Sequence, residues 1–528
     1  MTRRLAHTLL RSVAWLVAVL VLLTAALGWR LLSAPLSLAW LTPAIERALT
    51  PADGDFHVEI ERTELRRGAD RLIELIGYEV RGQAPDGRVL FALPEIELNL
   101  SLSALVLHGV VAPERIHAIA PSLGLVRRAD GSIGLRVSKD EKAAALQVTP
   151  KVLIGPFMSS DPDDPLAYLD SLNISGGRLV IYDEARGRSL MARNAEFVLE
   201  RGPAGVNAAV SFEIGQPQGP ARIAVTGIYR RGSDHIGFIA DVKRLSILPL
   251  AAFAPEIPLA GIDLTLDGRL TGALSLDGAL STVGFEVSAE DGRIERPDVL
   301  SRALPVDTLE VKGATQRDLK EVVIDSFEVT SSGTSLEGSG RLVRSAAGAG
   351  LSAELRAENV PAADLDLYWP PELGEKARKW VLENITAGIA PHAEATLEFA
   401  PGELEERPVP EASVHGRFAF HNLTVGYFKT LPPLEGVDGS ATFTARRMDI
   451  DVARAHVGNL EVSKGSAVIT GMGIKGRDTT QLEVVADVAG PIQEALALID
   501  HEPLGFASKI GIEPQATAGR TEVDLRIG

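Results

Sequence analysis

From Phe56 onward, apolar and polar residues alternate along the chain with a period of two. Between positions 264 and 276, every even-numbered residue is apolar or glycine: Leu264, Leu266, Gly268, Leu270, Gly272, Leu274 and Leu276. Two further stretches alternate in the same way and carry on one side Ile96, Leu98, Leu100 and Leu102, and Val437, Gly439, Ala441, Phe443 and Ala445. Successive side chains of a strand point to opposite faces, so this pattern predicts antiparallel strands with one apolar and one solvated face.

The amount of strand pattern limits how the sheet can be organised. Of the 528 residues, 45% are apolar but only 5% are aromatic, and there are 50 glycines. A single core rarely extends beyond about 250–300 residues, so one closed sandwich is excluded. Several small sandwiches in a row would need Pro- or Ser-rich linkers, which are scarce. We therefore expect a mainly β chain, in which one long curled antiparallel sheet presents an apolar groove.

An uncharged stretch of seventeen residues, Val13 to Trp29, lies close to the N-terminus. As a helix it would be about 25 Å long, at the low end for crossing a bilayer, and Arg30 can extend it by reaching the headgroups. Trp15 and Trp29 lie near its ends, where indoles prefer the interface. Arginines up to Arg11 precede it, which predicts a cytoplasmic N-terminus and a body on the other side.

A secretory signal peptide is the competing interpretation of this stretch. Signal peptides have a shorter apolar region, usually about 7–15 residues, and a small-residue cleavage site. The stretch is longer and ends in an unsuitable context at Gly28 and Trp29, so we expect a retained single-pass anchor. Either alternative exports the body of the chain.

Charge and cysteine content exclude several classes of function. The formal net charge is −17 and there is no cysteine. An acidic body does not attract nucleic acid, and disulfides, thiolate catalysis and cysteine-ligated zinc are impossible. Export without disulfides indicates a large bacterial envelope protein.

Three helices are expected among the strands. A short helix should follow the anchor at residues 43–49. A second should run from about Pro371 to Ile385 and dock on the sheet through Leu373, Ala377, Trp380 and Val381, with Glu375, Lys379 and Glu383 in water. The third should extend from Pro491 to about Asp500, with Ile492, Ala495, Leu496 and Ile499 on one face.

For each candidate catalytic or ligand-binding motif, a simpler structural interpretation is favoured. Residues 471–476 (GMGIKG) match a dinucleotide fingerprint, but a strand pattern follows where a helix is needed, which favours a hairpin turn. The ten histidines are scattered. Asp161, Asp163 and Asp164 lie between prolines and lack the rest of a calcium loop. We expect no enzyme, no cofactor and no metal site.

Several short segments resemble one protein family. Residues 125–131 (LVRRADG) and 172–183 (LNISGGRLVIYD) are similar to the N-terminal part of AsmA-like proteins. A more specific resemblance, to the YhdP branch of that superfamily, rests on residues 367–373 (LYWPPEL), 377–380 (ARKW), 385–388 (ITAG), 431–439 (LPPLEGVDG) and 500–504 (DHEPL). Chains of this branch are usually much longer, so we expect an N-terminal fragment or truncated form.

The resemblance implies a division of the chain and a function. We expect a cytoplasmic N-terminus and anchor (1–32), a first β segment of the AsmA-like region (33–137), a charged linker (138–168), a β-rich groove segment (169–360) and a YhdP-like β segment with two short helices (361–528). The family implies a bridge that is anchored in the bacterial inner membrane, has its body in the periplasm and conducts phospholipid along a β-groove toward the outer membrane. It carries no catalytic residues.

The expected lipid-groove positions are taken from the alternating stretches: Leu98, Leu100, Leu102, Leu264, Leu266, Leu270, Leu274, Leu276 and Phe443. The alternative for these positions is an ordinary sandwich core. The alternative function is an envelope scaffold or chaperone that assists outer-membrane protein assembly through exposed strand edges. Residues 521–527 alternate up to the last position, so we also expect a final strand with an unpaired edge, ready to pair with further sequence or a partner.

Overall fold

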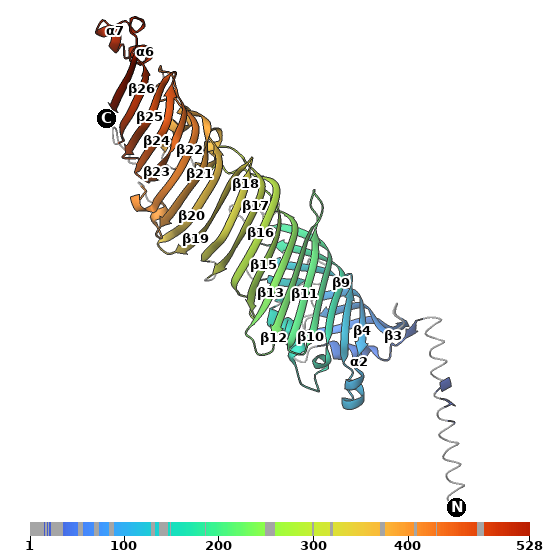
Figure 1. Ribbon diagram of the computed structural model, residues 1–528. Helices are drawn as coiled ribbons and strands as arrows, with labels where there is room; N and C mark the ends of the chain where they lie inside the picture. Colours follow the sequence, from blue (N-terminus) through green and yellow to red (C-terminus); the bar gives the residue numbers. More distant parts are fainter. Residues whose placement is uncertain are drawn as a thin grey trace, which may run out of the picture. The chain divides into compact units, whose positions relative to one another are not determined.

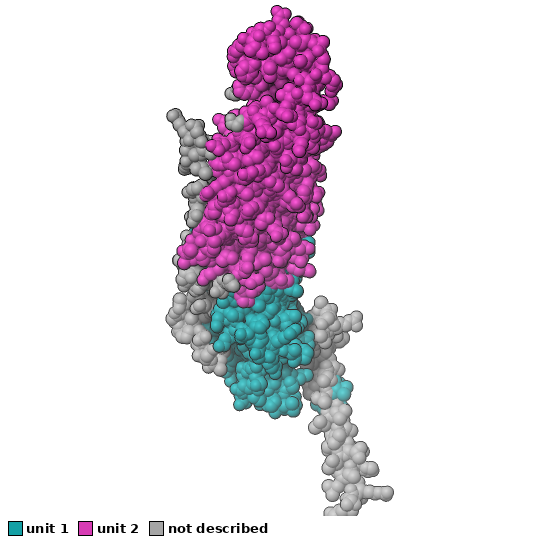
Figure 2. All heavy atoms as spheres, turned by 60° about the vertical axis from the view of Figure 1, so that its left-hand side comes forward, with its two compact units in different colours: residues 1–243, 272–280 teal, residues 244–271, 281–528 magenta. Residues whose placement is uncertain are grey.

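The structure is a computed structural model, drawn in Figure 1. It describes Trp15, Ala18, Val19, Val21 and Leu22, and residues 35–50, 56–67, 73–83, 89–127, 133–136, 146–147, 149–184, 186–248, 259–297, 300–316, 320–369, 375–405, 409–428, 430–472 and 480–527. Its internal contacts divide the chain into two compact units, which are coloured separately in Figure 2. Unit 1 comprises residues 1–243 and 272–280, and unit 2 comprises residues 244–271 and 281–528.

Unit 1 is a sheet with short helices at its margins. Its strands are β1 (Leu36–Ser37), β2 (His57–Arg67), β3 (Ile73–Gln83), β4 (Val89–Leu100), β5 (Pro113–Ile119), β6 (Ser122–Arg127), β7 (Ile133–Arg136), β8 (Leu146–Gln147), β9 (Ser171–Asp183), β10 (Arg188–Gly202), β11 (Gly205–Ile214), β12 (Ala221–Arg230) and most of β13 (His235–Ser246). Its helices are α2 (Thr42–Leu49), the π-helix η1 (Ala104–His108), α3 (Pro150–Met158) and the 3-10 turn η2 (Pro165–Tyr168).

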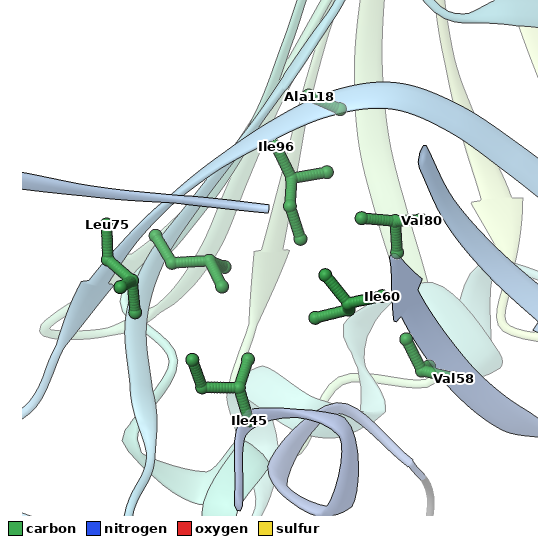
Figure 3. Close-up of a cluster of buried hydrophobic side chains, with 8 residues drawn as sticks. Ile45, Val58, Ile60, Leu75, Val80, Ile96 and Ala118 are labelled. Atoms are coloured by element: carbon green, nitrogen blue, oxygen red, sulfur yellow. The ribbon is translucent and has the colours of Figure 1, made fainter. Parts of the chain in front are cut away.

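The core of unit 1 forms where α2 packs on the first strands (Figure 3). Ile45 of α2 lies in one cluster with side chains of β2 to β5, among them Ile60, Leu75, Ile96 and Leu98. Val58 and Ile60 of β2, and Ile96 and Leu98 of β4, are two positions apart, so each of these strands contributes one face to the cluster. The expected helix at residues 43–49 is confirmed by α2, which begins one residue earlier.

Unit 1 departs from the expected antiparallel ladder at β9. This strand pairs in parallel with β5 through residues 171–175 and with β6 through residues 178–183. Its other edge pairs antiparallel with β10. The expected charged linker also contains structure: α3 begins after Thr149, whose hydroxyl caps the helix by accepting from the Val152 N–H, and it buries Ile154 and Phe157. The residues 137–145 of that linker lie outside the described residues.

Unit 2 contains the longer ladder. Its strands are β14 (Ile262–Asp263), part of β15 (Thr265–Ser275), β16 (Leu280–Ile294), β17 (Leu304–Gln316), β18 (Glu321–Ser331), β19 (Thr334–Ser345), β20 (Gly348–Pro361), β21 (Ile385–Phe399), β22 (Val414–Val425), β23 (Leu434–Thr444), β24 (Arg447–Val457), β25 (Leu460–Thr470), β26 (Gln481–Pro491) and β27 (Arg520–Ile527). From β16 to β27, each strand pairs antiparallel with the next in sequence.

Short helical segments connect some of these strands: η4 (Ala362–Asp364), α4 (Leu365–Tyr368), α5 (Glu375–Asn384), η5 (Glu403–Glu405), η6 (Glu411–Ser413), α6 (Ile492–Asp500), α7 (Phe506–Lys509) and η7 (Pro514–Ala516). The expected third helix is confirmed by α6, although Ile499 of its expected packing face is exposed. Residues 473–476 of the glycine motif lie outside the described residues, but β25 and β26 on either side form an antiparallel pair, as a hairpin requires.

The expected mainly β, open architecture is confirmed, but its curled form is wrong. The sheets are open and uncurled, and among the described strands of unit 2 the ladder does not close on itself. Strands such as β16, with 15 residues, and β18, with 11, pair over most of their length. Curling needs a systematic stagger or bulges repeated at regular positions, and the described register shifts of unit 2 are unevenly spread, with most of them between β21 and β24. Among the described residues, no helix is long and apolar enough to cross a membrane.

The docking expected for the second helix is also corrected. The described helix, α5, begins at Glu375, and Leu373 lies outside the described residues. Trp380 is 44% exposed, so its ring is not the buried anchor that the apolar spacing predicted. Arg378 attaches the helix instead, because its guanidinium donates to the Trp369 carbonyl at 2.7 Å. A polar contact of this kind leaves no trace in a hydrophobic pattern.

Candidate functional site

One face of the unit 2 sheet carries an unbroken line of apolar side chains. We call the following direct cross-strand partners, one from each strand between β16 and β27, the apolar row: Ala289, Leu309, Val329, Leu336, Ala357, Ala393, Phe418, Ala441, Ile450, Ala467, Val484 and Ile527. Strands are about 4.8 Å apart, so eleven spacings give the row a length of about 50 Å.

A second line runs beside the apolar row on the same face, two residues away on each strand from β16 to β26. Its members are apolar or glycine: Val287, Val311, Phe327, Gly338, Leu355, Ala395, Gly416, Phe443, Met448, Ile469 and Leu482. The two lines together are called the apolar face. It is therefore at least two side chains wide and contains no polar side chain along either line.

The apolar face is only partly covered. In the apolar row, Ala289 and Ala441 are buried, Ile527 is exposed, and the other side chains have intermediate exposure. Near β16 the row joins a cluster with Ile247 and Leu264, and near β22 it joins one with Ala362. The interior of a closed sandwich would bury these side chains throughout, so this degree of exposure is that of an accessible surface.

Phenylalanine–glycine pairs limit how far the side chains of the apolar face project from the sheet. Gly416 lies directly opposite Phe443, and a Cβ placed on Gly416 would lie 2.2 Å from the ring Cζ. Gly338 is related to Phe327 in the same way, with 2.9 Å between that Cβ and the ring Cε1. The rings therefore occupy the space over the glycines instead of standing away from the sheet. Three further pairs share this arrangement: Gly82 with Phe91, Gly313 with Phe285, and Gly439 with Phe420.

The opposite face of the same strands is charged. Arg356 on β20 pairs with Glu337 on β19 at 3.0 Å and with Glu394 on β21 at 3.5 Å, and Arg417 on β22 continues the chain of ion pairs to Glu394. Hydrogen bonds from His392 and Arg417 hold the pKa of the Glu394 carboxyl below its ordinary value. The alternation of the strands thus separates an apolar face from a well-paired charged face.

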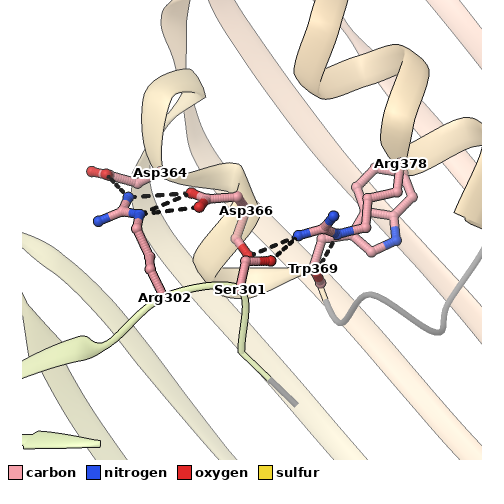
Figure 4. A network of polar contacts seen from close by, with 6 residues as sticks. All are labelled: Ser301, Arg302, Asp364, Asp366, Trp369 and Arg378. Atoms are coloured by element: carbon pink, nitrogen blue, oxygen red, sulfur yellow. Dashed lines mark hydrogen bonds and ion pairs between the residues drawn. The ribbon is translucent and has the colours of Figure 1, made fainter. Parts of the chain in front are cut away.

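A polar network fastens the β20–β21 connection, residues 362–384, to the chain before β17 (Figure 4). The Arg302 guanidinium lies 2.5 Å from Asp364 and 3.0 Å from Asp366, and these carboxylates raise its pKa above the ordinary value. Arg378 donates to Ser301 and to the Asp366 carbonyl. Ala362 and Leu365 of the same connection pack in the cluster around Phe420, so the connection covers one margin of the apolar face.

The expected groove residues are distributed over different surroundings. Phe443 lies on the apolar face of unit 2. Leu264 is buried and Leu266 packs beside it, whereas Leu98 is 2% exposed in the core of unit 1, with Leu100 packed against that core. Leu270, Leu274 and Leu276 have intermediate exposure. Leu102 lies beyond the end of β4 and is 74% exposed. Their role in lipid contact stays a prediction.

The anchor residues lie mostly outside the described part of the chain. Trp15 is helical and exposed, while Arg11, Trp29 and Arg30 are outside the described residues.

Most of the apolar face was missed by sequence reasoning, because its members in β19 to β21 are largely alanine and glycine. The signal was present: Leu336, Gly338 and Gly340 alternate with polar residues as the predicted groove residues do.

A line of polar groups on unit 1 was also missed. His117 lies 2.9 Å from Glu97 through Nδ1 and 2.7 Å from the Ser175 hydroxyl through Nε2. Serine hydrolases use groups in this order, but here they stand side by side on β4, β5 and β9, where they fix the parallel junction. Among the described residues, no group of three or more His, Asp or Glu side chains is placed to hold a metal ion.

Comparison with known proteins gives one match. The family model described as YhdP protein matches residues 240–527, which is more than half of the chain and includes β16 to β27. No curated protein and no solved structure matches the chain. The family match confirms the resemblance that the short segments indicated.

Proposed function

We propose that this chain, which belongs to the YhdP family, binds the acyl chains of phospholipids along the apolar face of unit 2. The observation that carries the proposal is the apolar row itself, continuous over β16 to β27 and only partly covered. Contiguous apolar surface on a protein body normally marks a binding surface, because exposing it to water is unfavourable.

The length of the row supports passage along the face as well as binding. One leaflet of a bilayer has a hydrocarbon layer about 15 Å deep, half of the roughly 30 Å core. A row of about 50 Å is therefore roughly three acyl chains long. A site for one lipid would need only a few strands, whereas a path needs every strand to contribute an apolar side chain. Each of the twelve strands β16 to β27 does so.

Family membership also supports a proposal for where the protein lies in the cell. Membership of this family indicates a protein of the cell envelope. We extend this to a bridge anchored in the bacterial inner membrane by residues 13–29, with its N-terminus in the cytoplasm and its body in the periplasm. It would conduct phospholipid toward the outer membrane. The basic residues before the uncharged stretch support this orientation, and the absence of catalytic motifs supports a role without chemistry.

A photo-crosslinking experiment tests the proposal. Replacing Phe327 by p-benzoylphenylalanine puts a reactive ring of similar size on the apolar face. Its neighbour Glu328 is exposed on the opposite face of the same strand and provides a matched control. After irradiation in cells, mass spectrometry should find phospholipid adducts at position 327 and few at position 328.

The outcomes separate the two functions under consideration. Equal lipid labelling at both positions would contradict a specific apolar path. Adducts at position 327 that consist of peptide segments from outer-membrane proteins would favour the scaffold or chaperone function instead. That alternative predicts client strands on the sheet rather than acyl chains.

A further inference from the structure

The loop between β4 and β5, residues 101–112, exposes a dense group of large apolar side chains. It contains no Asp, Glu, Lys or Arg. Val106 is 76% exposed, and its neighbours Leu105 and Leu107 are exposed on either side, as is Leu102. A run of three consecutive exposed aliphatic residues is unfavourable on a water-facing surface. The apolar face of unit 2 does not include this loop, so a second surface needs an occupant.

The described backbone hydrogen bonds of this loop are made within the loop itself. The Ser101 N–H donates across the loop to the Ala112 carbonyl, and the Leu105 N–H donates to the Ser101 carbonyl. The Gly109 N–H donates to the Leu105 carbonyl inside the π-helical turn η1. The hydroxyls of Ser101 and Ser103 are 2.9 Å apart and bond to each other. A lipid environment offers no partners for backbone groups, so a segment that enters it must hydrogen-bond internally. The loop meets this requirement at its exposed tip.

The loop leaves the sheet near the point where the chain enters unit 1 at β1. Six residues separate Trp29 from Leu36 of β1, so the two are at most about 25 Å apart. Leu36 pairs with Leu65 of β2, and β3 and β4 follow as the next neighbours, so β4 is three strand spacings, about 14 Å, from β1. Trp40, between β1 and α2, is 77% exposed. Indole side chains favour the membrane interface.

We propose that the β4–β5 loop, with Trp40, docks unit 1 on the lipid bilayer that holds residues 13–29, and that the side chains of Leu105, Val106 and Leu107 enter the boundary between headgroups and acyl chains. The proposal rests on the membrane anchor of the proposed function but concerns a different surface from the lipid path. Its consequence is that the first strands are held against the membrane surface, where a short linker alone would leave them free to rotate.

A single labelled cysteine tests this docking directly. The chain has no cysteine, so Val106→Cys gives one site for an environment-sensitive nitrobenzoxadiazole probe. The full chain is reconstituted in phosphatidylcholine vesicles that contain nitroxide-labelled lipids. Zwitterionic lipid is chosen because Asp161, Asp163 and Asp164 precede η2, whose Tyr168 contacts His108 of η1. Ile228→Cys on β12, also in unit 1 and exposed, is the matched control.

The expected result is a blue-shifted emission at position 106, quenched most strongly by nitroxides about 5–10 Å below the headgroups. Position 228 should show neither effect. Equal and weak quenching at the two positions would overturn the proposal. A blue shift at position 106 without nitroxide quenching would also overturn it, because protein would then cover the loop.

A second variant separates this proposal from the lipid path. Leu105→Asp with Leu107→Asp, in the Val106→Cys background, should abolish the quenching while circular dichroism and thermal unfolding stay unchanged, since both side chains are solvent-exposed. With p-benzoylphenylalanine at position 327, this variant should still form lipid adducts, because the lipid path and the docking surface are independent. If lipid adducts at position 327 are absent even when the β4–β5 loop is unaltered, the lipid path is contradicted and the docking proposal is not.

Discussion

In unit 1 a line of cross-strand partners runs over nine strands, much as the apolar row runs over twelve in unit 2. Its members are Leu65, Leu75, Leu98, Ile116, Leu172, Leu199, Ala208, Gly227 and Phe238. Three of them are buried in a core: Leu75 and Leu98 in the cluster with Ile45 of α2, and Leu199 in the cluster with Phe157 of α3. In unit 2, nine of the twelve side chains of the apolar row keep intermediate exposure, only Ala289 and Ala441 are buried, and the helical cover is confined to one margin.

The difference shows that the alternating pattern of a strand does not determine what its apolar face is used for. Both units contain long strands with the same period and similar composition. The segments between the strands decide the outcome: α2 and α3 each place large side chains over the sheet of unit 1. A face covered by its own chain becomes a core, and a face left open becomes a surface available to a ligand.

The largest expected difference between the units is the cost of truncating one leucine. Leu98→Ala removes a side chain buried in the core of unit 1 and should lower the free energy of unfolding by about 2–5 kcal/mol. Leu336→Ala, on the partly exposed apolar face, should cost less than about half of that, because much of the side chain is already in contact with water. Hydrogen exchange of β4 and β19 measures each effect locally. Equal costs would mean that the apolar face is a closed core.

The second-largest loss of stability is expected where the phenylalanine–glycine packing is disturbed. Gly416→Ala forces a methyl group into the Phe443 ring and towards the Glu394 carbonyl, and should cost about 1–3 kcal/mol. Gly237→Ala, in β13 of unit 1, has no atom within 4 Å of the added methyl and serves as the control. Replacing Phe443 by Leu in the Gly416→Ala background should restore part of the loss. A double-mutant cycle with no coupling energy would contradict the packing.

The contribution of the β20–β21 connection is expected to be smaller. Arg302→Ala removes its ion pairs to Asp364 and Asp366, and solvent screening limits the cost to about 1 kcal/mol or less. The readout is faster hydrogen exchange in residues 362–369 and 375–384. Arg447→Ala is a matched control, since Arg447 is similarly exposed and pairs with Asp449 on its own strand. Unchanged exchange would show that the apolar cluster around Ala362 alone holds the connection.

Acid should weaken the charged face of unit 2 to a modest extent. Hydrogen bonds from His392 and Arg417 lower the pKa of Glu394, and the Asn422 N–H, with Arg454, lowers that of Asp438. Carboxyls with a lowered pKa stabilise the fold above their ordinary range near pH 4, and this stabilisation is lost as the pH falls through the folded-state pKa. Thermal unfolding between pH 7 and pH 3 measures it. Glu394→Gln should show a shallower pH dependence than the unaltered chain.

Much of the strand content could be predicted from the sequence because the period-two signal is local. The positions of α2 and α6 were also predicted, since prolines and apolar spacing mark both. Register was not predictable: Gly416 meets Phe443 only through the pairing of β22 with β23, and no local pattern encodes that pairing. The parallel pairing of β9 depends in the same way on contacts distant in sequence.

The errors have physical causes in particular residues. The apolar spacing around Trp380 indicated a buried ring, but Arg378 fastens the helix through polar groups, so the ring can stay in water. For Leu98 and Leu336 the sequence gives the same alternation, and only the presence of Ile45 above Leu98 separates a core residue from a surface one. Cover by distant segments is the information that a single sequence lacks.

The phenylalanine rings that lie over glycines have a consequence for motion along the sheet. A flat ring over Gly338 or Gly416 removes the step that an upright side chain would create, so the surface has little relief from one strand to the next. Single atom contacts contribute only about 0.1–0.2 kcal/mol each, and on a surface without steps they are exchanged gradually as a hydrocarbon moves. For the lipid path proposed above, low relief means low barriers to sliding, and hence fast transit at the expense of selectivity for any one position.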